Sequence, residues 1–155
     1  TRFDPRGGPW GRGYLRAVRR ISPDDWFFSG HFKNDPCMPG TLMTEMAFQG
    51  MSVYLTALGY TLDKDGWTFA PVPGERCKLS CRGQVTPTSK ELVLEVFVRD
   101  VVAGPVPTLL VDILSTVDGL KALHAERLSL HLAPDFPVPS RRLLPPVASA
   151  ALWPQ

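Results

Sequence analysis

Residues 26–49 read WFFSGHFKNDPCMPGTLMTEMAFQ, and this stretch decides the fold. Its first half is dense in aromatic residues, Gly, Asp and Pro, which predicts a compact, ordered loop because Gly and Pro supply the backbone angles of tight turns. Its second half opens an apolar run without proline, which predicts a helix over residues 41–58. Thr41 can cap the start of this helix, and Gly59 follows its end.

The predicted helix carries one charged residue, Glu45, and apolar side chains on nearly every side. We therefore expect the helix to be buried. A single narrow polar stripe runs along it, formed by Glu45, Gln49, Ser52 and Thr56. A buried carboxyl group has to be hydrogen-bonded, paired or protonated, and one that stays protonated at neutral pH can act as a general acid. The alternative is that the stripe is the solvent-facing side of a surface helix.

The chain has three histidines, His31, His124 and His131, and only His31 lies in the aromatic loop. A histidine in a rigid loop is a candidate base, and a purely structural histidine is the alternative. Directly after the loop, the N–H groups of Gly40 and Thr41 open the helix as free donors at the positive end of its dipole. This position suits a developing oxyanion.

Beyond Gly59 the pattern changes from helix to strand. Alternating or β-branched stretches predict strands over residues 13–21, 76–86, 90–102, 107–117 and 120–132. The dipeptide Asp118-Gly119 between the last two predicts a tight hairpin. One helix followed by several long antiparallel strands predicts an α+β fold with the helix packed on one sheet.

Length, charge and cysteine content narrow the class of protein. With 155 residues and a formal net charge of +2, the chain is expected to be one domain that binds neither nucleic acid nor a membrane surface. Cys77 and Cys81 are expected to be small core residues on one strand face, since no second pair of metal ligands follows them. A metal site formed by His31, Asp35 and Glu45 is a weak alternative, because they lack the spacing of common metal motifs. No secretory signal or membrane span is recognisable, so we expect a cytoplasmic protein.

Residues 26–49 resemble the active-site segment of the bacterial 3-hydroxydecanoyl-ACP dehydratases, and still more that of the dehydratase domains of polyunsaturated fatty acid synthases and related polyketide synthases. The shared pattern is W-F-F-x-x-H-F-x-x-D-P-x-M-P-G, with an acid fourteen residues after the histidine. The segments RGQVTPTSKELVLEVFV and TVDGLKALHAERLSLHL resemble the strand pair and the closing hairpin of this family. The resemblance covers roughly residues 13–133. It implies the hotdog fold, in which a curved antiparallel sheet wraps a long central helix.

The resemblance implies roles for single residues. His31 would be the catalytic base, and Glu45 would be the acid on the central helix. The N–H group of Gly40, with Thr41 beside it, would bind and polarise the carbonyl of a thioester. No metal or redox cofactor is implied, since one base and one acid suffice for this chemistry. The substrate would arrive on the phosphopantetheine arm of an acyl carrier protein (ACP).

Further residues would support this pair. The Cys37 carbonyl would orient the His31 ring, and Gln49 would hold Glu45 from one helical turn along. The family also places a cis peptide bond after the histidine, here between His31 and Phe32. The acyl tunnel would be lined by Met43, Met46, Phe48 and Phe32.

The implied reaction is the dehydration of 3-hydroxyacyl-ACP to 2-enoyl-ACP in fatty acid or polyketide biosynthesis. One departure concerns Glu45: the decanoyl enzymes have Asp there, whereas other dehydratases of the fold use Glu. This departure argues against the double-bond isomerisation that the Asp enzymes also perform. The alternatives are an enoyl-ACP isomerase, an acyl-thioester hydrolase, and a non-catalytic domain that docks acyl carriers.

The resemblance also implies partners. In this family the histidine and the acid of one site come from different hotdog domains, so we expect a homodimer in isolation, or pairing with another domain of the parent chain. An acidic carrier protein could dock on the basic residues Arg16, Arg19, Arg20 and Lys33, which are otherwise ordinary surface charges. Residues 1–12 and the Pro-rich residues 134–155 are expected to be incoming and outgoing linkers. With no initial Met, residues 13–133 are expected to be a domain cut from a longer synthase.

Overall fold

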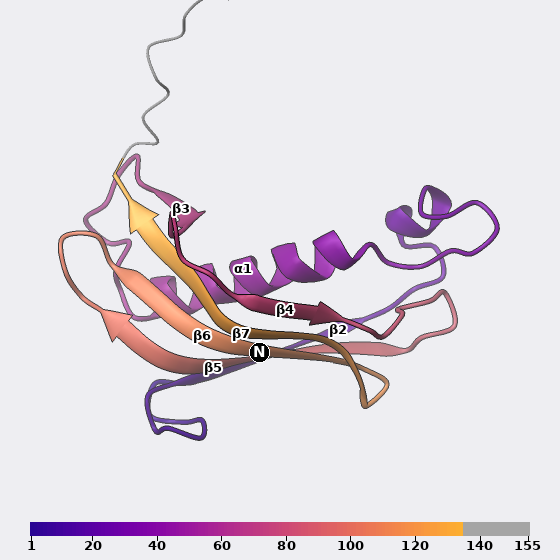
Figure 1. The fold of residues 1–155 in the computed structure, drawn as a ribbon, viewed down its shortest axis with the longest axis horizontal. Coiled ribbons are helices and arrows are strands. Elements are labelled where there is room, and N and C mark those ends of the chain that lie inside the picture. Colours follow the sequence, from indigo (N-terminus) through magenta and orange to yellow (C-terminus); the bar gives the residue numbers. More distant parts are fainter. Residues whose placement is uncertain (135–155) are drawn as a thin grey trace, which may run out of the picture.

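One long helix lies along the inner face of a curved antiparallel sheet (Figure 1). The structure, a computed structural model, describes residues 1–134, so nearly all of the expected linker over residues 134–155 lies outside the described residues. The elements are β1 (Arg2–Asp4), β2 (Tyr14–Arg20), the 3-10 turn η1 (Trp26–Ser29), α1 (Gly40–Ala57), β3 (Thr68–Pro71), β4 (Lys78–Cys81), β5 (Glu91–Val102), β6 (Thr108–Val117) and β7 (Leu120–Ala133). The strand order is β1-β2-β5-β6-β7-β3, and β4 pairs with another part of β7. This is the α+β arrangement that the sequence predicts.

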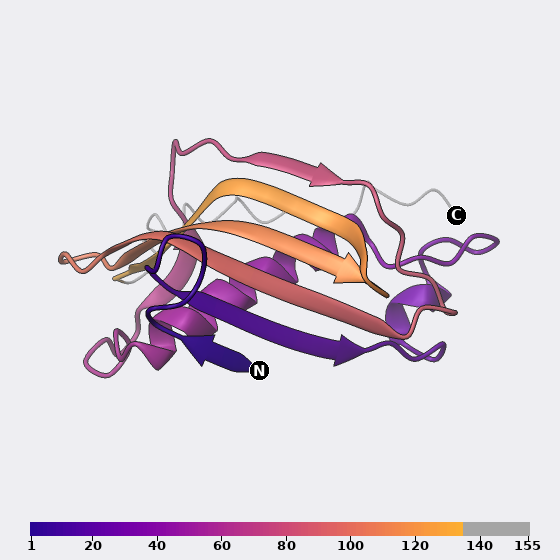
Figure 2. The ribbon, with the colours of Figure 1, turned by 90° about the horizontal axis from the view of Figure 1, so that it is seen from below.

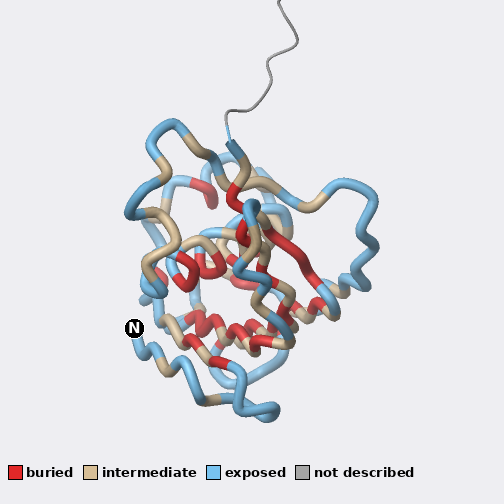
Figure 3. Tube along the Cα trace, turned by 90° about the vertical axis from the view of Figure 1, so that its left-hand side faces the viewer, coloured by how far each residue is buried: buried red, intermediate tan, exposed pale blue. Residues whose placement is uncertain are grey.

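The helix packs on the sheet through one apolar side. Its buried side chains are spaced so that they fall on that side: Met43, Ala47, Met51, Tyr54 and Leu55. Gly50 lets helix and sheet approach closely, because a Cβ atom there would lie 2.6 Å from the Leu94 side chain. Figure 3 shows the buried residues in red toward the middle of the molecule, with exposed residues in the outer loops.

The opposite side of α1 is not buried. Glu45, Gln49 and Thr56 of the polar stripe are exposed, and the apolar side chain of Val53 is 51% exposed. The expectation of a buried helix is therefore wrong for this side of the single chain. The sheet curves around only one side of the helix, which leaves the other side open (Figure 1).

The three long strands follow the prediction closely. β5, β6 and β7 begin and end within one residue of the predicted ranges. Asp118 and Gly119 form the hairpin between β6 and β7 with φ angles of 49° and 83°, as a tight hairpin requires. The Asp118 carboxylate accepts hydrogen bonds from the N–H groups of Lys90 and Glu91, at 3.0 and 2.9 Å, and so ties the hairpin to the start of β5.

The strand predicted over residues 76–86 is shorter, since only β4 pairs with the sheet. The chain departs at Gly83, where a Cβ atom would lie 2.6 Å from the backbone of β7. Val85 then turns inward and is buried, and its carbonyl accepts a hydrogen bond from the Met38 N–H at 2.8 Å. The segment after β4 therefore braces the loop before α1 instead of extending the sheet.

Both cysteines of this segment, Cys77 and Cys81, are exposed. The expectation that they are small core residues is wrong, because β4 lies at an edge of the sheet and pairs only with β7. Within residues 1–134, no group of three or more His, Cys, Asp or Glu side chains is arranged to hold a metal ion.

Residues 1–12, expected to be a linker, contribute to the fold. β1 pairs with β2 at one edge of the sheet (Figure 2). In the strand order, β3 lies at the other end. The Phe3 ring packs on the Tyr54 ring, with centroids 5.1 Å apart. The chain enters β2 through Gly13, which has a φ of +139° and lies so close to α1 that a Cβ atom would overlap the Tyr54 hydroxyl group. The N-terminal residues therefore cover the C-terminal half of α1, and the sheet begins earlier than the sequence predicts.

Gly13→Ala is expected to lower the free energy of unfolding by about 3 kcal/mol, because the added methyl group overlaps Tyr54 at a φ that alanine disfavours. Gly30→Ala is the matched control, since nothing lies within 4 Å of a Cβ atom there and its φ of −111° is ordinary. Urea unfolding followed by circular dichroism measures both variants. Equal stability of the two would show that the close approach at Gly13 does not constrain the fold.

Candidate active site

The loop before α1 is held by buried aromatic rings and backbone hydrogen bonds. η1 places Phe27 and Phe28 in the core, with ring centroids 4.5 Å apart. Phe32 and Asp35 exchange two backbone hydrogen bonds, which close a tight turn. The peptide bond between His31 and Phe32 is cis, as the resemblance implied. The loop therefore presents His31 on a defined backbone.

His31 is held by Cys37 from across this turn. The Cys37 N–H donates to the His31 carbonyl at 2.7 Å, and His31 Nδ1 lies 3.0 Å from the Cys37 carbonyl oxygen. A carbonyl oxygen can only accept, so Nδ1 carries the proton and Nε2 carries the lone pair. The ring is half-buried and stacks on Phe32, with centroids 4.0 Å apart. His31 Nε2 thus keeps its lone pair available, and the Cys37 carbonyl lies where the resemblance implied.

The helix begins at Gly40, one residue before the predicted start. The N–H groups of Gly40 and Thr41 precede the first bond of the helix, which Leu42 donates to the Pro39 carbonyl at 3.0 Å. In the part of the chain that the structure describes, neither N–H group has a backbone acceptor, so both are free donors at the positive end of the helix dipole. Thr41 is exposed and does not cap the helix as expected, because Pro39 occupies the cap position. A Cβ atom on Gly40 would lie 3.1 Å from Cys81 Sγ, so a larger residue would crowd this corner.

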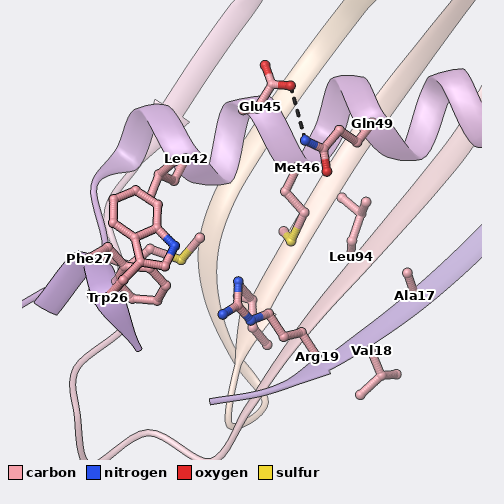
Figure 4. A pocket seen from close by; sticks show the side chains of 12 residues that line it. Ala17, Val18, Arg19, Trp26, Phe27, Leu42, Glu45, Met46, Gln49 and Leu94 are labelled. Atoms are coloured by element: carbon pink, nitrogen blue, oxygen red, sulfur yellow. Dashed lines mark hydrogen bonds between the residues drawn. The ribbon is translucent and has the colours of Figure 1, made fainter. Parts of the chain in front are cut away.

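Glu45 lies on the exposed side of α1, in its second turn. Its Oε1 accepts a hydrogen bond from Gln49 Nε2 at 3.2 Å (Figure 4). Gln49 therefore holds the carboxyl group from one helical turn along. Ser52 instead donates its hydroxyl to the Phe48 carbonyl, so the polar stripe does not act as one network.

Glu45 and Gln49 line two clefts, one on each side of them. The first, about 270 Å³, lies between α1 and the strands β2 and β5. Figure 4 shows Met46 pointing from α1 into this cleft and Trp26 at one end of it. Its apolar walls include Ala17, Trp26, Phe27, Leu42, Met46 and Leu94. The second, about 280 Å³, lies between α1 and β3 and is lined by Phe48, Ser52, Phe69, Pro71 and Leu130.

The predicted tunnel residues divide between the clefts and other places. Met46 lines the first cleft, and Phe48 lines the second. Met43 is 1% exposed in the core under α1, and Phe32 is 58% exposed beside His31. Ala17, which lines the first cleft, was not predicted from the sequence. The only signal for it is the alternation of apolar and polar residues along β2, which is too imperfect to show which residues face the helix.

The basic residues expected near the loop stand mostly opposite carboxylates. Arg19 donates a hydrogen bond to Asp25 at 2.8 Å. In the register of β2 and β5, Arg16 stands opposite Glu95, and Arg20 stands opposite Glu91. Within residues 1–134, Arg19 is the one of these three arginines that forms an ion pair, which favours an ordinary structural role for Arg19. Lys33 is exposed in the loop beside His31.

Comparison with known proteins places the chain in a family. A family model described as a FabA-like domain matches residues 1–126. The chain belongs to this family. This FabA-like domain is also 31% identical over 100 residues to a polyunsaturated fatty acid synthase subunit from Thraustochytrium sp. (strain ATCC 26185 / S-3). The matched residues are 64% of this chain and 7% of that relative, so the chain spans only a small part of the relative's length.

Solved structures of low sequence identity share the fold of this FabA-like domain. A hypothetical thioesterase protein with coenzyme A from Streptococcus pneumoniae TIGR4 has a TM-score of 0.51 and 9% identity, over 79% of this chain and 80% of that one. A probable thioesterase from Bartonella henselae has a TM-score of 0.50 and 14% identity, over 78% and 90%. These likenesses concern the fold alone, and the predicted hotdog fold is confirmed. None of the helices in residues 1–134 has the length and apolar character of a membrane span.

Proposed function

We propose that this FabA-like domain is a dehydratase that converts 3-hydroxyacyl-ACP to 2-enoyl-ACP and water. The observation that carries the proposal is the state of His31, whose Nδ1 proton is engaged by the Cys37 carbonyl, so that Nε2 is left as a base. Glu45, backed by Gln49, contributes a carboxyl group from α1. One base and one acid are sufficient to remove water across a C2–C3 bond. The relative's name, which describes part of a polyunsaturated fatty acid synthase, supports acyl chains as the substrate class.

The proposed reaction needs only His31, Gly40 and Glu45 to move its protons and stabilise its charge. His31 Nε2 removes the C2 proton, and the Gly40 N–H stabilises the charge that develops on the thioester oxygen. Protonated Glu45 gives its proton to the C3 hydroxyl group as the C3–O bond breaks, which releases water. The proton on His31 returns to Glu45 through solvent before the next turnover. The scheme needs no metal or redox cofactor.

A second hotdog domain is the proposed cover for the open side of α1. Glu45 and Val53 stand on this side, exposed in the single chain. A general acid works best where water is excluded, and pairing would bury this side of the helix. In isolation the second domain would be another copy of this chain, giving a homodimer with two sites. In a longer synthase it could equally be a different domain.

An acyl carrier protein is the other proposed partner. We place this encounter in the cytoplasm. The free thiols of Cys37, Cys77 and Cys81 fit a reducing compartment. Lys33 is the best placed basic residue for an acidic carrier protein, because it is exposed in the His31 loop while the arginines of β2 stand opposite carboxylates.

A product assay tests the proposed function. The full 155-residue chain is incubated with 3-hydroxyacyl thioesters on ACP or on a pantetheine mimic, and the products are resolved by mass spectrometry. A 2-enoyl thioester, lighter by one water, supports the dehydratase. Conversion of an added 2-enoyl thioester to a 3-enoyl or cis-2 product would instead show an isomerase, and free acid with free thiol would show a hydrolase. Carrier binding without any conversion would show a docking domain.

The first cleft is the proposed site for the acyl chain, because its walls are apolar and it opens beside Glu45. Ala17→Leu is expected to lower kcat/KM about tenfold for long acyl chains and less than about twofold for short ones, since the added carbons fill the cleft. Ala103→Leu, in the exposed turn between β5 and β6, is the matched control. An equal loss for long and short chains would contradict this location of the chain.

A further inference from the structure

We propose that the side chain of Cys37, and not only its backbone, positions His31 for catalysis. The Cys37 thiol lies 3.5 Å from His31 Nδ1, the same ring nitrogen that the Cys37 carbonyl meets at 3.0 Å. This inference rests on the proposed function of His31 as a base and adds a group to it. The thiol is a positioning group, since it acts through the His31 ring and not on the substrate.

Cys37 is fixed firmly enough for this role. It is 9% exposed, and its N–H donates to the His31 carbonyl at 2.7 Å. The next residue, Met38, is buried and bonded through its N–H to the Val85 carbonyl at 2.8 Å. Cys37 therefore meets His31 at three points, through its N–H, its carbonyl and its thiol. The two backbone contacts fix the Cys37 backbone beside the ring, and burial of the side chain limits the positions that its thiol can take.

The donor and the acceptors in the contact between Cys37 and His31 can be assigned. The carbonyl oxygen accepts the Nδ1 proton, so the sulfur beside the same nitrogen is a second, weak acceptor. Sulfur is polarisable, and it lies at the edge of a ring that becomes an imidazolium when Nε2 takes the C2 proton. The thiol thus stabilises the charged ring and resists its rotation. An aliphatic side chain of similar size would fill the space and do neither.

The thiols of Cys77 and Cys81 differ from that of Cys37 in their surroundings. Among the described residues, Cys37 is the only cysteine with a hydrogen-bond contact to a histidine. Cys81 lies against Gly40, and partial burial raises the pKa of its thiol. Cys77 precedes β4 and is exposed. A substitution at Cys77 is therefore a suitable control for the loss of a thiol as such.

Three variants of the full chain test the inference. Cys37→Ser keeps a small side chain with an acceptor, Cys37→Val keeps the bulk without one, and Cys77→Val is the control. We expect kcat for dehydration to fall about fivefold in Cys37→Val with KM unchanged, and to stay within about twofold in the other two. A loss in kcat alone reports on the ring during proton transfer, whereas a disturbed fold would change KM and stability as well.

Nuclear magnetic resonance adds a measurement that does not depend on turnover. With three histidines in the chain, the Nδ1–H signal of His31 is assigned by its loss in His31→Asn. We expect this proton to exchange slowly with water in the unaltered chain and in Cys37→Ser, and faster in Cys37→Val. Unchanged kcat and exchange in Cys37→Val would overturn the inference and leave the thiol as filler. If the chain dehydrates no substrate, the proposed function fails, while the exchange rate still decides whether the thiol holds the ring.

Discussion

His31→Asn is expected to lower kcat for 3-hydroxyacyl dehydration about a thousandfold while the fold is kept. The asparagine amide can still donate a hydrogen bond toward the Cys37 carbonyl, but it has no basic nitrogen at the position of Nε2. The loss would therefore report the missing base and not a collapsed loop. Quantifying the 2-enoyl thioester by mass spectrometry measures the effect, and circular dichroism checks the fold.

His124→Asn is the matched control for this prediction. His124 is half-buried on β7, with Nδ1 3.8 Å from Glu126, and it stands apart from both clefts beside α1. Its substitution is expected to change kcat by less than about twofold. If His31→Asn kept more than about a tenth of the turnover, His31 would not be the base, and the dehydratase mechanism would fall with it.

The long strands were predictable because their own residues determine them. β5, β6 and β7 are long and rich in β-branched residues, and Asp118-Gly119 adopts the backbone angles that their hairpin needs. β1 and β3, with three and four residues, are too short to show a pattern and owe their conformation to pairing with neighbours. The strand over residues 76–86 was overpredicted because the contact between Val85 and the loop before α1 competes with the sheet.

The geometry of the candidate site was predictable only where its residues are continuous in sequence. His31, Cys37 and Gly40 belong to one segment, so their motif already indicates that they lie together. The first cleft joins Ala17 to Met46, and only the folded chain brings these two together. An apolar residue such as Val53 indicates burial without indicating which surface covers it. This is why the helix was expected to be buried while one side of it is open in the single chain.

Glu45→Gln is expected to lower kcat about a thousandfold with KM changed little. Glutamine matches glutamate in size and can still meet Gln49, but it has no proton to give to a leaving hydroxyl group at neutral pH. Glu126→Gln is the matched control, because Glu126 lies on β7 and faces Lys78 at 3.6 Å. Turnover of Glu45→Gln close to that of this control would remove Glu45 from the mechanism.

Mixing the two inactive variants, His31→Asn and Glu45→Gln, tests whether one site is built from two copies. If the base of one copy works with the acid of the other, each mixed dimer keeps one intact pair out of two. When the two variants pair at random in equal amounts, half of the dimers contain one copy of each. Since each of these dimers has one working site out of two, about a quarter of the unaltered turnover should return. Such recovery would explain why Glu45 stands on the open side of α1, since that side would face the second copy. If both variants are folded and dimeric and mixing restores nothing, base and acid act within one chain, and the shared site is wrong.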